Sequence, residues 1–257
     1  QYVRNLNPEN YYSVYQNSYE SLNDISLVYN ENPLNIDTNG NLIIPEGADN
    51  FTSEVLDEET QLAPGDDDYQ TVNNIDERKQ RLTENNLIFA TSFSYTKDNR
   101  ENLFDENFSI FKIKLELAGN VLASTSNLLG LEKNSDGRYE LFGVAYSQYA
   151  KTEFDYIKHW SLGGNNVLAM RNYFGIAIPY GNSNNIPFSK SFFAGGANDN
   201  RAWTAYNLGS GSSDSNNEFN EANMKLALSL EYRYHLFGNV KGAFFIDVGN
   251  IWNALDD

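Results

Sequence analysis

The sequence predicts an all-β fold, a transmembrane antiparallel β-barrel of which this chain supplies about seven strands together with a polar loop insertion. Two observations support this prediction. From residue 87 onward, segments of about ten residues alternate between apolar and polar side chains and are separated by turn residues. No apolar run approaches the roughly 18 residues that a membrane-spanning helix needs, so any crossing has to be made by strands.

Residues 1–86 have a different character. They carry 17 acidic and 4 basic side chains, a net charge of −13 out of −17 for the whole chain. We predict an irregular acidic loop insertion here, with short helices over 8–24 and 75–84 and one possible strand over 24–30. Nucleic acid is not expected as a partner, because its phosphates require clusters of Lys and Arg. The chain has no cysteine, which excludes disulfides and thiolate chemistry.

After residue 87 the sequence predicts seven strands, each with apolar side chains at alternate positions and small, polar or charged ones between them. The pattern is clearest over 223–236, where apolar residues at even positions alternate with polar ones such as Ser229 and Glu231. The predicted strands are 87–97, 108–118, 139–149, 152–162, 166–179, 223–236 and 240–252.

Alternation alone fits both a soluble β-sandwich and a membrane barrel, because each buries one face of its strands. The predicted strands run to about 10–14 residues, longer than the usual 5–6 of soluble sheets and enough to cross a bilayer at a tilt. Aromatic side chains also gather near strand ends, as in an interfacial girdle. These are Tyr139, Tyr149, Trp160, Tyr173, Tyr234 and Trp252. Strand length and aromatic placement together favour the membrane barrel.

Gly238 and Asn239 predict a two-residue hairpin turn between the last two strands. Such a turn would set Glu231 opposite Ile246 and one step from Asp247. By strand parity, both carboxylates would point to the polar face, where they can converge on one cation.

Two motifs lie within this pattern. Residues 192–203 read FFAGGANDNRAW between two predicted strands, and residues 245–249 read FIDVG on the last strand. Together they resemble the BamA/TamA superfamily of outer-membrane assembly factors and two-partner exporters, whose lumen-filling loop carries [VI]RG[FYW] and whose later strand carries F-x-D-x-G. The second motif matches in full, whereas Asn200-Arg201-Ala202-Trp203 departs at the aliphatic and glycine positions.

Further stretches make the sequence most similar to the TamA-like lipoprotein branch of the Bacteroidetes: LELAGN at 115–120, IPYGNSNNIPF at 178–188 and LEYRYHLFGNVKG at 230–242. The resemblance covers residues 87–257 well and 1–86 poorly. It implies a barrel of about sixteen strands, of which this chain would supply about strands seven to thirteen as part of a longer protein.

The resemblance also implies roles for individual residues. Arg201 would clamp the lumen loop, defined as residues 180–221, onto Asp247, with Glu231 as a second acceptor. The loop would be packed through Gly195, Gly196, Trp203, Phe192 and Phe193, while Phe245 and Gly249 belong to the motif strand. The alternatives are a solvated arginine, an ordinary flexible loop and a place for the aromatic side chains in the interfacial girdle. We expect no catalytic residue, metal site or cofactor.

The function implied by the resemblance is non-enzymatic insertion, assembly or translocation of proteins by an integral protein of the bacterial outer membrane. Its partners would be nascent outer-membrane proteins as clients, accessory periplasmic or lipoprotein subunits, and membrane lipid. Two other functions remain open. One is a passive, porin-like channel with an open lumen, and the other is a secreted β-sandwich that binds glycans through its Tyr and Trp residues.

The side of the membrane on which 31–86 lies is predicted differently by two arguments. Counting the predicted strands back from the lumen loop puts 31–86 at the periplasmic end. Its length and acidity favour the cell surface, because periplasmic turns are usually short. We therefore place 31–86 at the surface and expect either a missed strand or an irregular segment among the predicted strands.

Overall fold

The computed structural model describes residues 1–134, 137–212 and 220–254. The chain forms two compact units, one of them Tyr2–Asn86 and the other made of most residues after Asn86 together with Gln1. Across the described ranges, no helix combines the length and the hydropathy needed to cross a bilayer.

The unit Tyr2–Asn86 is helical, with buried Leu22, Phe51, Val55 and Val72 in its core. Short strands β1 and β2 form a two-stranded sheet at its ends. Its elements are β1 (Tyr2–Val3), η1 (Pro8–Asn10), α1 (Tyr11–Val14), α2 (Gln16–Tyr29), η2 (Pro33–Asn35), α3 (Glu46–Leu56), α4 (Asp67–Thr83) and β2 (Asn86–Leu87).

This unit corrects two sequence-based expectations. Residues 24–30, predicted as a possible strand, lie almost entirely in α2, where Leu22 and Ile25 are one helical turn apart and buried on the same side. The segment 31–86, predicted as irregular apart from a short helix over 75–84, contains α3 and α4, and α4 begins eight residues before that predicted helix. α4 buries Val72, Ile75 and Leu82, and it has acidic residues in its first turn and Arg81 in its last, as the helix dipole favours. Because many polar residues separate these apolar positions, the helical spacing was not recognised over the whole of α4.

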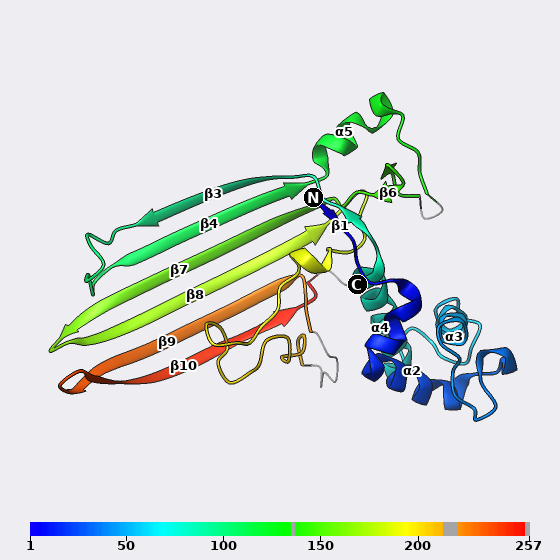
Figure 1. Ribbon diagram of the computed structural model, residues 1–257, viewed down its shortest axis with the longest axis horizontal. Coiled ribbons are helices and arrows are strands. Elements are labelled where there is room, and N and C mark those ends of the chain that lie inside the picture. The colour runs from blue at the N-terminus through cyan, green and yellow to red at the C-terminus, as the bar shows by residue number, and fades with distance from the viewer. Residues whose placement is uncertain (135–136, 213–219, 255–257) are drawn as a thin grey trace. The chain divides into compact units, whose positions relative to one another are not determined.

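The second unit is built on one antiparallel sheet of six strands, in the order β10-β9-β8-β7-β4-β3 (Figure 1). Within the described residues the sheet does not close on itself, since β3 and β10 are its two edges. The strands are β3 (Ala90–Asp98), β4 (Ser109–Ala118), β7 (Tyr149–Gly163), β8 (Asn166–Pro179), β9 (Met224–Phe237) and β10 (Val240–Trp252).

The predicted strand 139–149 is wrong. Most of it folds as a small hairpin of β5 (Glu140–Leu141) and β6 (Val144–Ala145) outside the main sheet, and β7 begins only at Tyr149. The hairpin turns at Phe142 and Gly143, which both have positive φ angles of 57° and 73°. The helix α5 (Asn120–Leu129), which precedes it, was not predicted either.

The number of strands between residue 87 and the lumen loop determines the end of the sheet at which β3 begins. Four strands, β3, β4, β7 and β8, separate residue 87 from the lumen loop. An even number of antiparallel crossings brings the start of β3 to the same end of the sheet as that loop (Figure 1). Segments 119–148 and 180–223 connect strands at this end, and the connections at the other end are 99–108, 164–165 and 238–239. The count of five predicted strands before the lumen loop is therefore corrected to four.

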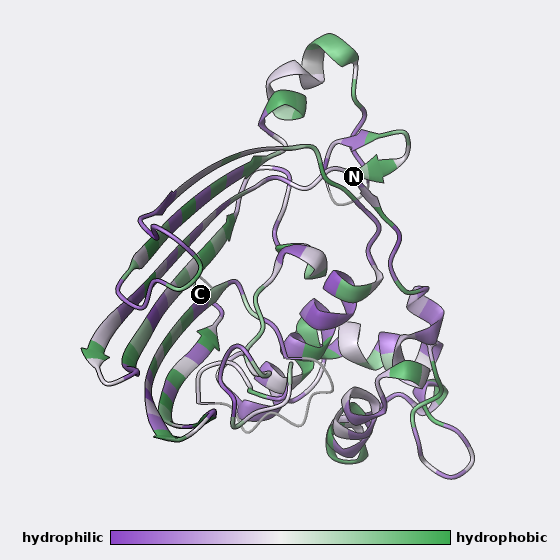
Figure 2. Cartoon of the chain, turned by 60° about the vertical axis from the view of Figure 1, so that its left-hand side comes forward, coloured by the Kyte–Doolittle hydropathy of each residue, from purple (hydrophilic) through white to green (hydrophobic). Residues whose placement is uncertain are grey.

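The strand register places apolar side chains together on one face. Leu228 of β9 lies between Asn172 of β8 and Val248 of β10, and the next row on the same face pairs Met170, Leu230 and Ile246. This face is exposed, with Leu228 retaining 40% and Ile246 65% of their accessible surface. The sheet is curved, and residues 180–212 of the lumen loop lie on its concave side (Figure 2).

The hairpin between β9 and β10 differs by one residue from the predicted register. A bulge at Val240 and Lys241 shifts the pairing, so that Glu231 lies opposite Phe245 and Asp247 opposite Ser229. The shift puts Glu231, Phe245 and Asp247 on the same, concave face. The tight turn could be predicted from Gly238-Asn239, but the extra unpaired residue beside it could not.

Candidate functional site

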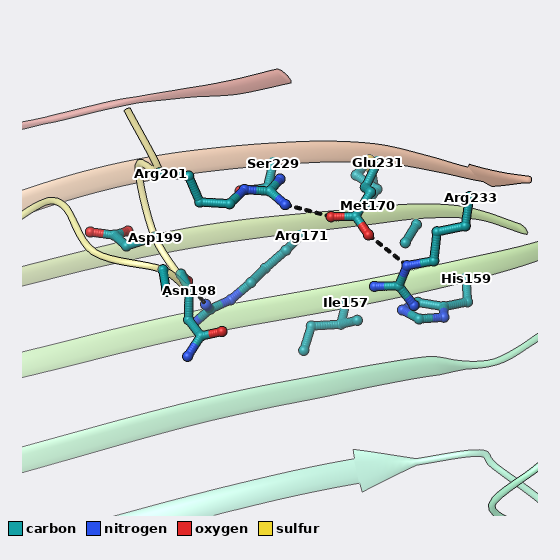
Figure 3. Close-up of a pocket in the computed structure, with 12 residues that line it drawn as sticks. Ile157, His159, Met170, Arg171, Asn198, Asp199, Arg201, Ser229, Glu231 and Arg233 are labelled. Atoms are coloured by element: carbon teal, nitrogen blue, oxygen red, sulfur yellow. Dashed lines mark hydrogen bonds and ion pairs between the residues drawn. The ribbon is translucent and has the colours of Figure 1, made fainter. Parts of the chain in front are cut away.

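The site is built around Arg201, which the lumen loop presents to the concave face of β9 and β10. Its Nε donates to Oδ2 of Asp247 at 2.7 Å and its Nη2 donates to Oδ1 at 2.8 Å, a paired geometry that only a guanidinium provides. Its Nη1 donates to Oε2 of Glu231 at 2.5 Å (Figure 3). The structure thus brings together the three residues singled out from the sequence.

Further contacts hold the guanidinium in place. Its central carbon lies 3.6 Å from the centroid of the Phe245 ring, a cation–π contact. Glu231 also accepts a hydrogen bond of 2.6 Å from Nε of Arg233. Hydrogen bonds to Asp247, and then to Glu231, raise the pKa of Arg201 above its ordinary value. Two arginines and two carboxylates therefore alternate across β9, β10 and the loop, and their charges balance.

Gly249 of the motif strand makes room for the loop. The side-chain amide of Asn200 donates to the carbonyl of Gly249 at 2.9 Å. A Cβ at position 249 would lie 2.8 Å from Oδ1 of Asn200 and 2.6 Å from the carbonyl oxygen of Leu226. Phe245, Asp247 and Gly249 of the F-x-D-x-G motif thus contact adjacent loop residues: the ring and the carboxylate contact Arg201, and the glycine contacts Asn200.

The glycine pair in the loop forms a tight, ordered turn. Gly195 has a φ of +100° and Gly196 a φ of +107°. The Gly195 N–H donates to Oδ2 of Asp199 at 2.8 Å, and the Gly196 N–H donates to the carbonyl of Trp203 at 2.8 Å. A Cβ at Gly195 would lie only 2.3 Å from the carbonyl oxygen of Thr204. Close backbone approach, rather than flexibility, explains a glycine at this position.

The aromatic residues of the loop behave differently from one another. Phe192 is buried, and its ring sits over Gly175 of β8, where a Cβ would lie 2.6 Å from the ring. Phe193 stacks on Tyr206 with ring centroids 4.1 Å apart. Trp203 is 48% exposed, which corrects the expectation that its side chain packs beneath the loop. Its backbone carbonyl, not its indole, takes part in the turn.

Other charged residues of the concave face were missed in the sequence analysis. Lys225 Nζ donates to Asp199 of the loop at 2.7 Å, and Arg171 pairs with Asp155 at 2.9 Å while donating to the carbonyl of Asn198 at 3.1 Å. Lys190 of the loop pairs with Glu116 of β4 at 2.7 Å. The alternation along each strand places Lys225, Arg171 and Glu116 on the polar face. Their partners in the loop are tens of residues away in the sequence, so no short motif indicated these contacts.

An open pocket of about 220 Å³ lies beside the Arg201 cluster, between the loop and the sheet. Its lining includes His159, Arg171, Arg201, Glu231 and Arg233 (Figure 3). The two histidines have separate neighbours: His159 packs on Phe108, and Nε2 of His235 lies 2.8 Å from the carbonyl oxygen of Gly238. In the described part of the chain, no group of three or more His, Asp or Glu side chains is arranged to hold a metal ion.

A family profile described as "Omp85 superfamily domain" matches residues 7–256. The match spans the helical unit as well as the sheet, although the motifs noted in the sequence all lie after residue 87. No curated protein matches the chain significantly.

Proposed function

Because the chain belongs to the Omp85 superfamily, whose members are outer-membrane proteins that insert or translocate other proteins, we propose that it works as a BamA/TamA-type assembly or translocation barrel. In this proposal the six strands form part of a closed barrel of about sixteen strands. The exposed apolar face contacts lipid, and the charged concave face lines the lumen. The wording of the loop and strand motifs supports a place in the TamA-like lipoprotein branch of the Bacteroidetes.

The observation that carries this proposal is the docking of Arg201 on Asp247 and Glu231. It holds a long loop against the inner face of the sheet, where a passive channel needs open space. The loop also contacts β4, β9 and β10 on the concave face through Lys190, Asp199 and Asn200. A docked loop favours an assembly barrel over the porin-like alternative.

The proposed work requires no catalytic chemistry. An unfolded client strand brings backbone N–H and C=O groups that are costly to leave unpaired in lipid. A barrel that opens at a strand edge satisfies them by β-augmentation, because the edge offers the complementary groups. The clients are nascent outer-membrane proteins, helped by accessory periplasmic or lipoprotein subunits and by the surrounding lipid.

The full-length protein in liposomes should accelerate folding of a small unfolded β-barrel client, measured as the heat-modifiable folded band on gels. It should also show little ion conductance, which should rise when loop residues 186–206 are deleted, since the loop occupies the lumen. Liposomes without protein provide the control for spontaneous insertion. High conductance with the loop intact, together with client folding no faster than in empty liposomes, would instead establish a passive channel.

The sheet end that carries the long connections is proposed to face the cell surface, and residue 87 enters the sheet at this end. A protease specific for acidic residues, added to intact cells, should therefore cut the helical unit at exposed Glu58 or Glu59. A periplasmic marker protein that stays uncut provides the control for intact outer membranes. Protection of these sites on intact cells, with cleavage only after lysis, would place the helical unit in the periplasm.

A further inference from the structure

Glu116 is a carboxylate on the concave face of β4 that lies far along the sheet from the Arg201 cluster. It is only 5% exposed. Its Oε1 accepts hydrogen bonds from the Tyr149 hydroxyl at 2.6 Å and from Nζ of Lys190 at 2.7 Å. Lys190 ends the short helix η3 (Phe188–Lys190), in the first part of the lumen loop. A buried strand carboxylate is thus paired with a loop ammonium group.

Lys190 can stay in its place only while Glu116 balances the positive charge of the lysines around it. Nζ of Lys114 lies 3.6 Å from its Oε2. Nζ of Lys151 donates to the backbone carbonyl of Lys190 at 2.7 Å and pairs with Glu153 at 3.1 Å. Three ammonium groups therefore meet two carboxylates. If Glu116 were neutral, Lys190 would enter a site with excess positive charge, and a poorly solvated ammonium group is costly without its partner.

The neighbouring loop residues reinforce this first attachment. The ring of Phe192 fills the space over Gly175 of β8, and the backbone of Phe192 exchanges two hydrogen bonds of 2.8 Å with Ala222, the residue that follows the loop. These contacts fix residues 188–192 to β4, β7 and β8. Arg201 binds β9 and β10 instead, so β7 and β8 lie between the strands that hold the two acidic partners.

We propose that Glu116 is a second, independent anchor of the lumen loop, and that it positions the first arm of the loop, residues 188–192, through Lys190. The loop is then held in two regions: Glu116 positions the first arm, and Arg201, beside the contacts of Asp199 and Asn200, holds the second arm, residues 198–201. Loss of either anchor releases one arm and leaves the other docked. The inference rests on the proposed function in that it concerns the same loop, but it describes where the loop is held and not what the barrel transports.

The test places a spin label on each arm of the full-length protein in liposomes. The chain has no cysteine, so single cysteines at exposed Ser189 and Asn198 label the two arms. Lys190→Gln should give the Ser189 label a mobile spectral component and leave the Asn198 label unchanged. Arg201→Ala should do the reverse. Glu116→Gln should match Lys190→Gln, and the double variant should show no greater mobility than either single one.

Lys190→Arg is the matched control, because it keeps the positive charge and should keep the Ser189 label immobile. The inference is overturned if Lys190→Gln leaves the Ser189 label immobile, or if Arg201→Ala mobilises both labels equally, since the loop would then have one anchor. Client folding is measured separately in the same liposomes. Its absence beside the expected mobility pattern would reject the proposed function and leave the two-anchor inference standing.

Discussion

Leu228→Arg should destabilise the folded protein in a bilayer by about 2–4 kcal/mol, the cost of a cationic side chain near the midplane of a barrel's lipid face. Leu228 lies mid-strand in β9 on the exposed apolar face, between Asn172 and Val248. No carboxylate lies opposite it on the neighbouring strands. The free energy of unfolding in liposomes, from urea titrations followed by tryptophan fluorescence, measures this cost.

Two control variants separate the lipid contact from other effects. Ser229→Arg changes the next residue, which faces the polar concave side between Arg171 and Asp247, so the new guanidinium stays in contact with water and should cost much less. Leu228→Met keeps an apolar side chain of similar volume and should cost less than about 1.5 kcal/mol. Equal losses for Leu228→Arg and Ser229→Arg would show that the apolar face does not contact lipid.

The two faces of the sheet could be predicted because side chains of a strand point to alternate faces, and this two-residue alternation is visible in one sequence. All six long strands of the main sheet were recognised in this way, and Arg201, Asp247 and Glu231 were singled out by motif and parity. The helices of the first unit were only partly predicted. Their apolar positions, such as Val72 and Ile75 of α4, are separated by many polar residues, and only the tertiary packing shows that they form a core.

Features that depend on long-range contacts were not predictable. In the sequence, Glu116 is one of several polar residues at alternate positions of its strand. Lys190 lies 74 residues further along the chain, and only the folded loop brings it to Glu116. Glu231 and Asp247 share a face because the bulge at Val240 and Lys241 pairs Glu231 with Phe245. The predicted pair of Glu231 with Ile246 would have put Asp247 on the other face, so the two carboxylates were predicted correctly but the register that brings them together was not.

Arg201→Ala should cost about 2–4 kcal/mol of unfolding free energy, more than an exposed ion pair and less than a fully buried one. The arginine side chain is 24% exposed, but that of Asp247 is only 6% exposed. Without Arg201, Asp247 loses both of its guanidinium hydrogen bonds. Asp247→Ala should cost less, because Arg201 keeps Glu231 as a partner. Arg201→Lys should recover part of the loss, since one ammonium group cannot make the paired contact.

The double variant Arg201→Ala/Asp247→Ala decides whether these residues act as a pair. Removing both partners leaves no buried carboxylate without its cation, so the combined loss should be smaller than the sum of the single losses by about 1–3 kcal/mol. The same variants should mobilise a spin label at Asn198 and slow client folding, because the second arm of the loop is released. Strictly additive losses, with the Asn198 label immobile in Arg201→Ala, would mean that Arg201 contributes to stability locally and does not hold the loop against the sheet.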